Sequence, residues 1–168
     1  MKVYLHNRKD IKVFQDGKPL KIYYKGGVEY VEPQVGSGGY FELNFIKKSE
    51  FSGGLWFVRA LLFWIVGIMG FFTPRYAKCV HSLDCKMRAK ALTDSDAINV
   101  SFIHPNPRYG VGAGVKVREE SVSSLNGDSY IVDKKAAKRK RLYTLLSAVL
   151  RLAVIALVIA LIIKTAVG

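Results

Sequence analysis

Residues 143–167 read YTLLSAVLRLAVIALVIALIIKTAV, and Arg151 and Lys164 are the charged residues in this stretch. A bilayer core about 30 Å thick is crossed by roughly 20 apolar residues at 1.5 Å rise per residue, so the stretch can span a membrane with some tilt. The alternative is a buried core helix, but a soluble chain of 168 residues is too small to enclose a helix that is apolar on all faces. The sequence therefore predicts an integral membrane protein with a C-terminal transmembrane helix, residues 143–168.

A polybasic run, residues 134–142, directly precedes this helix and is the densest cation cluster of a chain with a net charge of +13. Lys and Arg beside a spanning helix mark its cytoplasmic side, and each contributes about 1 kcal/mol of attraction to an anionic leaflet. We expect the run to orient the helix and to contact anionic lipid headgroups through Lys134, Lys135, Lys138, Arg139, Lys140 and Arg141. A nucleic-acid partner is not expected, because no aromatic residues are interleaved with these cations.

A second apolar segment, residues 54–74, differs in length and composition. Arg59 leaves fourteen residues, 60–73, without charge, which is the length class of re-entrant or interfacial segments. Gly67, Gly70 and Pro74 favour a bend over a straight helix. The segment is rich in aromatic residues, which favour the membrane interface: Trp56, Phe57, Phe63, Trp64, Phe71 and Phe72. We expect it to dip into the membrane and return, and a second spanning helix is the alternative.

Arg59 and Arg151 are intramembrane charges, a feature that usually signals function. Both lie towards the expected cytoplasmic side, where a long side chain can extend back to the headgroups. We expect this arrangement for Arg59. For the deeper Arg151, pairing with a polar group of a partner subunit is an open alternative.

The charge pattern also bears on the side of the membrane that the remaining residues occupy. Arg75, Lys78 and Lys86 follow the first apolar segment and the polybasic run precedes the second, so residues 75–141 should face the cytoplasm. The first residues are charged and no apolar run follows them, so we expect no signal peptide. If residues 54–74 dip and return, residues 1–53 lie on the same side, and the bulk of the chain faces the cytoplasm.

Alternating apolar and polar residues dominate the regions 1–53 and 75–133. Asp16-Gly17, between strands at 11–15 and 18–24, is typical of a type I′ hairpin turn, and Pro19 places its strand at a sheet edge. Further strands are predicted at 28–32, 40–46, 84–91, 97–103, 114–118 and 130–132. Each region alone would make a marginal core. Joined, they predict one small antiparallel β-sandwich or barrel of about eight strands, interrupted by the segment 54–74.

Residues that could carry chemistry are few. Cys79, His81 and Cys85 would share one face of a strand and form a weak metal candidate, but a structural zinc site usually needs four ligands. A cytoplasmic face instead predicts two reduced thiols. Residues 108–114, RYGVGAG, lack the strand and helix that flank a dinucleotide-binding loop and are predicted to connect two strands. No catalytic residue, metal or cofactor is predicted.

These features favour a non-catalytic membrane-anchored β-domain protein. It would bind a protein partner or a second copy of itself and act as a binding or assembly subunit of a membrane complex at the cytoplasmic face. The alternative is a small oligomeric transport or channel subunit built on two transmembrane helices, with Arg151 near a polar path. An enzyme stays open as a third class, because catalytic groups can converge from distant positions.

Overall fold

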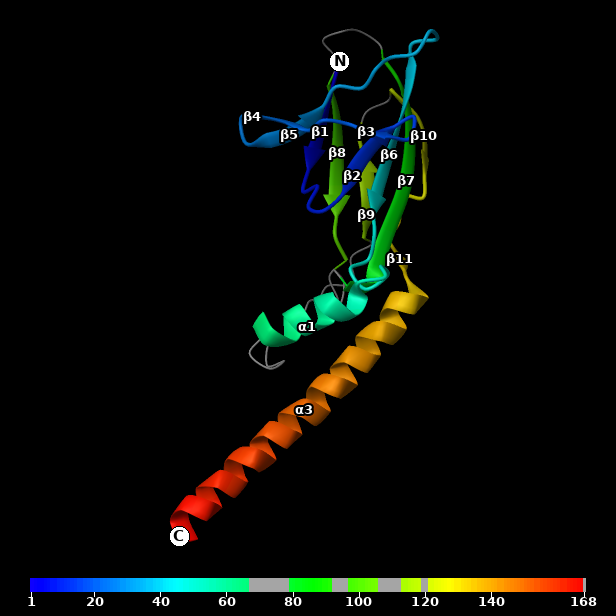
Figure 1. The fold of residues 1–168 in the computed structure, drawn as a ribbon. Coiled ribbons are helices and arrows are strands. Elements are labelled where there is room, and N and C mark those ends of the chain that lie inside the picture. Colours follow the sequence, from blue (N-terminus) through cyan, green and yellow to red (C-terminus); the bar gives the residue numbers. More distant parts are fainter. Residues whose placement is uncertain (67–78, 92–96, 106–112, 119–120, 168) are drawn as a thin grey trace. The chain divides into compact units, whose positions relative to one another are not determined.

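The computed structural model describes residues 1–66, 79–91, 97–105, 113–118 and 121–167, with the backbone alone at residue 167. The chain divides into two compact units. The β unit comprises Met1–Lys48 and His81–Ile131, and the helical unit comprises Ser49–Val80 and Val132–Gly168. Each unit is therefore assembled from two separate parts of the sequence, as the colours in Figure 1 show.

One sheet of the β unit has the strand order β4-β5-β1-β8-β9. Its strands are β1 (Lys2–His6), β4 (Tyr23–Lys25), β5 (Val28–Val31), β8 (Ala97–Ile103) and β9 (Gly114–Val117). β1 lies in the middle, antiparallel to β5 and parallel to β8, so the prediction of a wholly antiparallel fold is wrong. This strand was not expected from the sequence, because five residues give little alternation to detect and β8 lies far along the chain.

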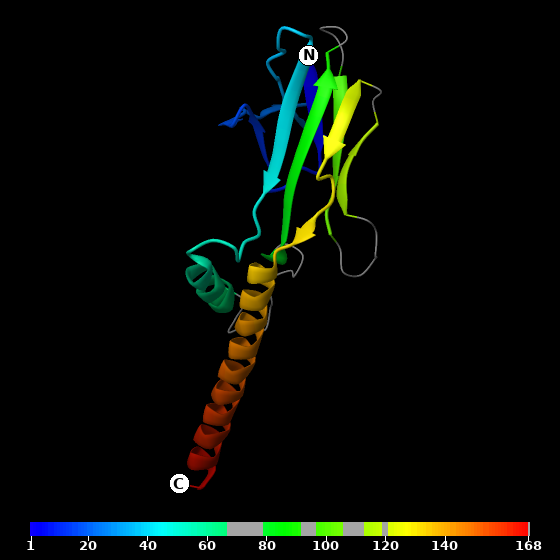
Figure 2. The same ribbon diagram turned by 90° about the vertical axis from the view of Figure 1, so that its right-hand side faces the viewer.

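The second sheet has the order β10-β7-β6-β2-β3, and β11 also pairs with β7. Its strands are β2 (Lys12–Gln15), β3 (Lys18–Pro19), β6 (Tyr40–Lys47), β7 (His81–Lys90), β10 (Val122–Asn126) and β11 (Ile131–Val132). β6 and β7 pair from Tyr40 opposite Lys90 to Lys47 opposite Leu83. Figure 2 shows them side by side, β6 in cyan and β7 in green. The strand before the apolar segment 54–74 thus pairs directly with the strand after it.

Both sheets contribute side chains to one hydrophobic core. The Phe45 ring of β6 meets the Phe102 ring of β8 edge-on, with 5.3 Å between centroids. The buried members are Val3, Leu5, Ile11, Val13, Val31, Phe41, Leu43, Phe45, Leu83, Cys85, Met87, Ala89, Ile98, Val100, Phe102 and Val115. The predicted mainly β fold is therefore confirmed.

The predicted alternative of a closed barrel is wrong. The two sheets stay open, because β3 and β10 end one strand path and β4 and β9 end the other. The described residues contain eleven strands rather than about eight, since β1 and β10 were not foreseen and the expected strand 18–24 is divided into β3 and β4. The β2–β3 hairpin is confirmed: Asp16 and Gly17 have φ of 48° and 75°, and Pro19 lies in an edge strand.

The helical unit contains α1 (Trp56–Val66) and α3 (Lys134–Val167). Among the described residues, α3 is the one helix that is long and apolar enough to cross a membrane, and α1 is a shorter apolar helix. α3 begins at Lys134 rather than at the predicted Tyr143. Since Lys, Arg and Ala are strong helix formers, the polybasic run continues the helix and forms its first two turns.

Candidate functional site

The first turns of α3 and one side of α1 come together in the helical unit. Phe51, Ala60, Cys79, Val80, Ala136 and Tyr143 form a buried hydrophobic cluster, with Trp56, Phe63, Trp64 and Ala137 packed against it. The ring of Phe51, in the loop before α1, lies 6.1 Å from that of Phe63 and 6.0 Å from that of Tyr143 between centroids. The cluster therefore joins the loop, α1 and α3 into one structure.

Apart from Arg59, the residues of α1 are apolar, and those that do not pack on the cluster are exposed. Ala60 is its buried residue, whereas Phe57 and Ile65 are 59 % and 58 % exposed. Of the predicted interface aromatics, Phe57 lies on this exposed side, and Trp56 and Trp64 pack on the cluster. Phe71 and Phe72 lie outside the described residues. Contiguous apolar surface of this kind usually marks contact with lipid or with another protein.

Asp133 caps the N-terminus of α3. One carboxylate oxygen accepts a hydrogen bond of 3.0 Å from the Ala136 amide, and the other accepts one of 2.8 Å from the Ser49 hydroxyl. These bonds hold the pKa of Asp133 below its ordinary value, because they favour the charged form. Asp133 was not singled out from the sequence, although an Asp directly before a helical run is an N-cap signal.

Arg139 uses its guanidinium within the helical unit. Its Nη1 donates to the carbonyl oxygens of Phe51, Ser52 and Gly53 at 2.7, 3.0 and 3.0 Å. The guanidinium carbon lies 5.2 Å from the centroid of the Trp56 ring. Arg139 therefore fixes the loop that leads into α1, and its planar group suits this combination of hydrogen bonds and ring stacking.

The six cations of the polybasic run fall into two groups. Lys140 is 6 % exposed, and its Nζ lies 4.9 Å from the centroid of the Tyr143 ring. Arg139 and Lys140 thus have contacts within the protein, and headgroup contact by the six cations of the run stays a prediction. The exposed cations of the run are Lys134, Lys135, Lys138 and Arg141.

Arg59 and Arg151 both reach towards the N-terminal side of their own helix. Arg59 Nη1 donates to the Glu50 carbonyl at 3.0 Å, and Arg151 Nε donates to the Ser147 carbonyl at 3.1 Å. Helical side chains lean towards the helix N-terminus, which at α3 is the polybasic end. The extension of these side chains to the headgroups stays a prediction.

An apolar groove of about 350 Å³ runs between α1 and α3. It is lined by Trp56, Phe57, Ala60, Leu61, Trp64, Tyr143, Leu146, Ser147, Val149 and Leu150. Two polar atoms of lining residues, Trp64 Nε1 and the Tyr143 hydroxyl, are buried and have no hydrogen-bond partner among the described residues. No sequence signal pointed to this groove, because its two sides are distant in the chain.

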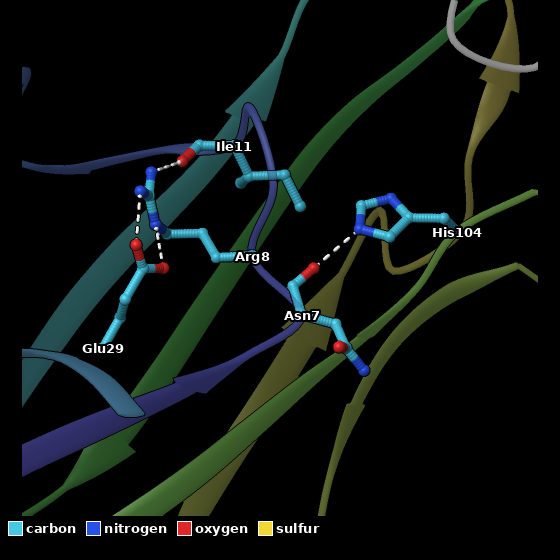
Figure 3. A network of polar contacts seen from close by, with 5 residues as sticks. All are labelled: Asn7, Arg8, Ile11, Glu29 and His104. Carbon is cyan, nitrogen blue, oxygen red and sulfur yellow. Dashed lines mark hydrogen bonds and ion pairs between the residues drawn. The ribbon is translucent and has the colours of Figure 1, made fainter. Parts of the chain in front are cut away.

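A polar network holds the loop between β1 and β2 in the β unit (Figure 3). Arg8 makes two bonds of 2.7 and 2.9 Å to the Glu29 carboxylate and one of 2.6 Å to the Ile11 carbonyl. His104 Nε2 donates to the Asn7 carbonyl at 2.6 Å, and its Nδ1 accepts from the Tyr130 hydroxyl at 2.9 Å. Because Asn7 has a φ of 58°, the network stabilises a strained turn, and its role is structural.

The candidate metal ligands Cys79, His81 and Cys85 do not lie on one strand. Cys79 is helical, whereas β7 begins at His81, so the expected common strand face does not exist. Among the described residues, no group of three His, Cys, Asp or Glu side chains could hold a metal ion. Cys79 donates to a Glu50 carboxylate oxygen at 3.5 Å, and burial raises the pKa of Cys85 to about 12. Residues 106–112, which include most of the glycine-rich stretch, lie outside the described part.

A polar groove of about 340 Å³ lies on the second sheet of the β unit. Gln15 and Gln34 line it and are joined by reciprocal bonds of 2.6 and 2.9 Å. The Arg88 guanidinium lies 3.7 Å from Glu42 and 5.1 Å from the Tyr40 ring centroid. An aromatic ring flanked by charges and amides is suited to binding a polar partner.

Comparisons with protein-family models, with curated proteins and with solved structures found no match to this chain.

Proposed function

We propose that this chain is a non-catalytic, membrane-anchored protein whose β unit is a sandwich facing the cytoplasm and acts as a binding or assembly subunit of a membrane complex. The observation that carries the proposal is the exposed apolar surface of α3 beyond its polybasic turns. Leu152, Leu157 and Ile162 are 67 %, 63 % and 60 % exposed. In water this surface would strongly favour association, whereas in hydrocarbon it needs no partner.

The strand pairing supports a single crossing. Since β6 and β7 hydrogen-bond along their length, the chain must return to the side from which residue 49 leaves. This pairing favours a dipping segment over the alternative of a channel subunit with two spanning helices.

The shared core of the two sheets supports the sandwich, and the polar groove beside Tyr40 supplies a surface for a protein partner. The cytoplasmic orientation rests on the exposed cations at the start of α3, because Lys and Arg are retained on that side. Anionic headgroups are the lipid partner that these cations favour.

Impermeant-maleimide labelling of the full chain in sealed membranes tests the proposal. Lys18→Cys in β3 and Lys86→Cys in β7 replace exposed residues in the two parts of the β unit. Both should be labelled in inverted, cytoplasm-out vesicles and protected in right-side-out vesicles. Labelling of the two positions from opposite sides would contradict the single crossing, and release of the chain by alkaline carbonate would contradict the anchor.

The assembly role is tested by crosslinking from the polar groove. A photoreactive residue at Gln34 should yield a discrete adduct in native membranes, and Arg88→Glu should abolish it. A photoreactive residue at the exposed Lys21, which does not line the groove, is the matched control. Equal adducts from both positions would contradict a partner surface at the groove.

A further inference from the structure

The segment that joins the edge strands of the two sheets in the β unit is basic and exposed. Residues 18–27 read KPLKIYYKGG and contain no acidic residue. They run from β3, at the edge of the second sheet, to β4, at the edge of the first sheet, and end in the turn that follows β4 (Figure 1). Leu20 and Ile22 pack against the hydrophobic core, whereas the lysines and one tyrosine are exposed: Lys18, Lys21, Tyr24 and Lys25. Residues 18–27 are called the basic rim below.

The two tyrosines of the basic rim differ in exposure. Tyr24 is 73 % exposed, which leaves a large aromatic ring in solvent beside Lys25. Tyr23 instead stacks on Tyr30 of β5 with 5.4 Å between centroids, and Lys21 Nζ lies 5.2 Å from the Tyr23 centroid. An exposed amphipathic ring among lysines is the side-chain pattern that favours the interface between water and lipid headgroups.

We propose that the basic rim binds the anionic headgroups of the leaflet in which the chain is anchored, with the Tyr24 ring at the interface and the three lysines at the phosphates. This surface rests on the proposed function, because α3 then tethers the β unit to that leaflet. A tethered domain meets its binding surface at a high effective concentration. Contacts that are weak one by one, as for single lysines at an anionic leaflet, are therefore sufficient to dock it.

Two other partners fit the basic rim less well. A β-strand of another protein would have to pair with an edge strand, and Pro19 and the lysines are residues that prevent such pairing. A single-stranded nucleic acid binds by stacking its bases on aromatic ring faces. Tyr23 and Tyr30 stack on each other, and Lys2 Nζ lies 4.9 Å from the Tyr30 centroid. These ring faces are therefore occupied, and the exposed lysines favour a charged surface over a row of bases.

Fluorescence of the full chain in lipid nanodiscs tests the proposal. A thiol-reactive NBD fluorophore is attached at Tyr24→Cys, where its emission rises on entering the interface; Cys79 and Cys85 are buried and should not react. Discs of phosphatidylcholine alone are compared with discs that also contain phosphatidylserine. We expect the emission to rise in the anionic discs at low salt and to fall again as salt screens the charges. The same fluorophore at Ser123→Cys, an exposed position of β10 at the opposite edge of the second sheet, should not respond.

Neutralising the basic rim provides the second arm. Lys21→Gln combined with Lys25→Gln should lower the ratio of docked to undocked chains about fivefold for each lysine, the equivalent of about 1 kcal/mol each. Lys86→Gln combined with Lys90→Gln removes the same charge from exposed positions of β7 and should leave the ratio unchanged. Circular dichroism checks that both variants keep their strand content.

Equal emission in the two kinds of disc, or an equal loss in the two pairs of lysine variants, would overturn the surface. So would an equal rise in phosphatidylcholine discs on addition of soluble polyglutamate or polyuridylate, because it would assign the basic rim to an acidic protein or a nucleic acid. Co-elution of the chain with the disc lipids separates the two proposals. A chain that co-elutes without a response would refute the basic rim alone, whereas a chain that does not co-elute would refute the membrane anchor on which the rim depends.

Discussion

Asp133 joins the two parts of the helical unit at a single carboxylate. It accepts from Ala136 in the first turn of α3 and from Ser49, which lies far earlier in the chain. In addition, its amide donates to the Val80 carbonyl at 2.8 Å. One residue therefore fixes both the helix start and the neighbouring backbone.

Replacement of Asp133 should loosen the start of α3. Asp133→Ala removes a cap worth about 1 kcal/mol, whereas Asp133→Asn keeps a capping oxygen. We expect amide hydrogen exchange in the first turn of α3 to accelerate about fivefold in the Ala variant and much less in the Asn variant. The pKa of Asp133 is lowered from 3.8 in the folded chain. The stabilisation of α3 by the charged carboxylate should therefore decrease as the pH falls below 3.8 and through that lowered pKa. Equal rates of amide hydrogen exchange in the two variants would show that Asp133 does not stabilise α3 as an N-cap.

His104 makes the stability of the β unit depend on pH. Burial lowers its pKa from 6.5, although the bond to the Asn7 carbonyl opposes that shift. The unfolded chain therefore takes up a proton at a higher pH than the folded chain, and the free energy of unfolding falls as the pH drops below 6.5. Denaturant titrations of the full chain between pH 8 and pH 5 should show this loss. The free energy of unfolding should change less steeply with pH in His104→Gln. An unchanged pH dependence would mean that another group is responsible.

At the scale of elements, α3 changes character along its length without a break. Its first two turns carry the cations and its later turns are apolar and exposed. α1 depends on those first turns, because Arg139 binds the three carbonyls before it and Tyr143 packs against Phe51. The basic segment at the start of α3 therefore also holds the loop that leads into α1.

A charge-conserving pair of variants isolates this support. Arg139→Lys loses the planar group that reaches three carbonyls, whereas Arg141→Lys changes an exposed residue of the same run. We expect amide hydrogen exchange in residues 53–60 to rise about tenfold in Arg139→Lys, as for loss of a charged hydrogen bond worth about 1.5 kcal/mol. Arg141→Lys should resemble the parent chain. Equal exchange in both variants would show that charge alone holds the loop.

At the scale of the whole molecule, each unit closes by joining distant parts of the chain. The two cysteines report on the units separately, because Cys79 belongs to the helical unit and Cys85 to the β unit. Neither cysteine forms a disulfide, and both are buried. Native cysteine accessibility therefore cannot serve as a test of topology, and introduced surface cysteines are needed.

The burial of both thiols predicts that they react slowly in the folded protein. A maleimide should label neither Cys79 nor Cys85 in the native protein, because each thiol is inaccessible and burial raises the pKa of Cys85 to about 12. Both should react once denaturant unfolds the chain. The single variants Cys79→Ser and Cys85→Ser assign the signal to each unit by mass spectrometry. Rapid labelling of either thiol under native conditions would contradict the fold of that unit.

The sequence by itself determined the features that depend on local pattern. The apolar run beyond Tyr143 marks a helix able to span a membrane, alternation marks the strands, and Asp16-Gly17 marks a hairpin, because each signal lies within one element. The tertiary structure decided what depends on distant residues: the central place of β1, the open ends of both sheets, and the internal use of Arg139 and Lys140. The groove with Tyr143 and Trp64 belongs to this second group, because its two helices are brought together only by folding.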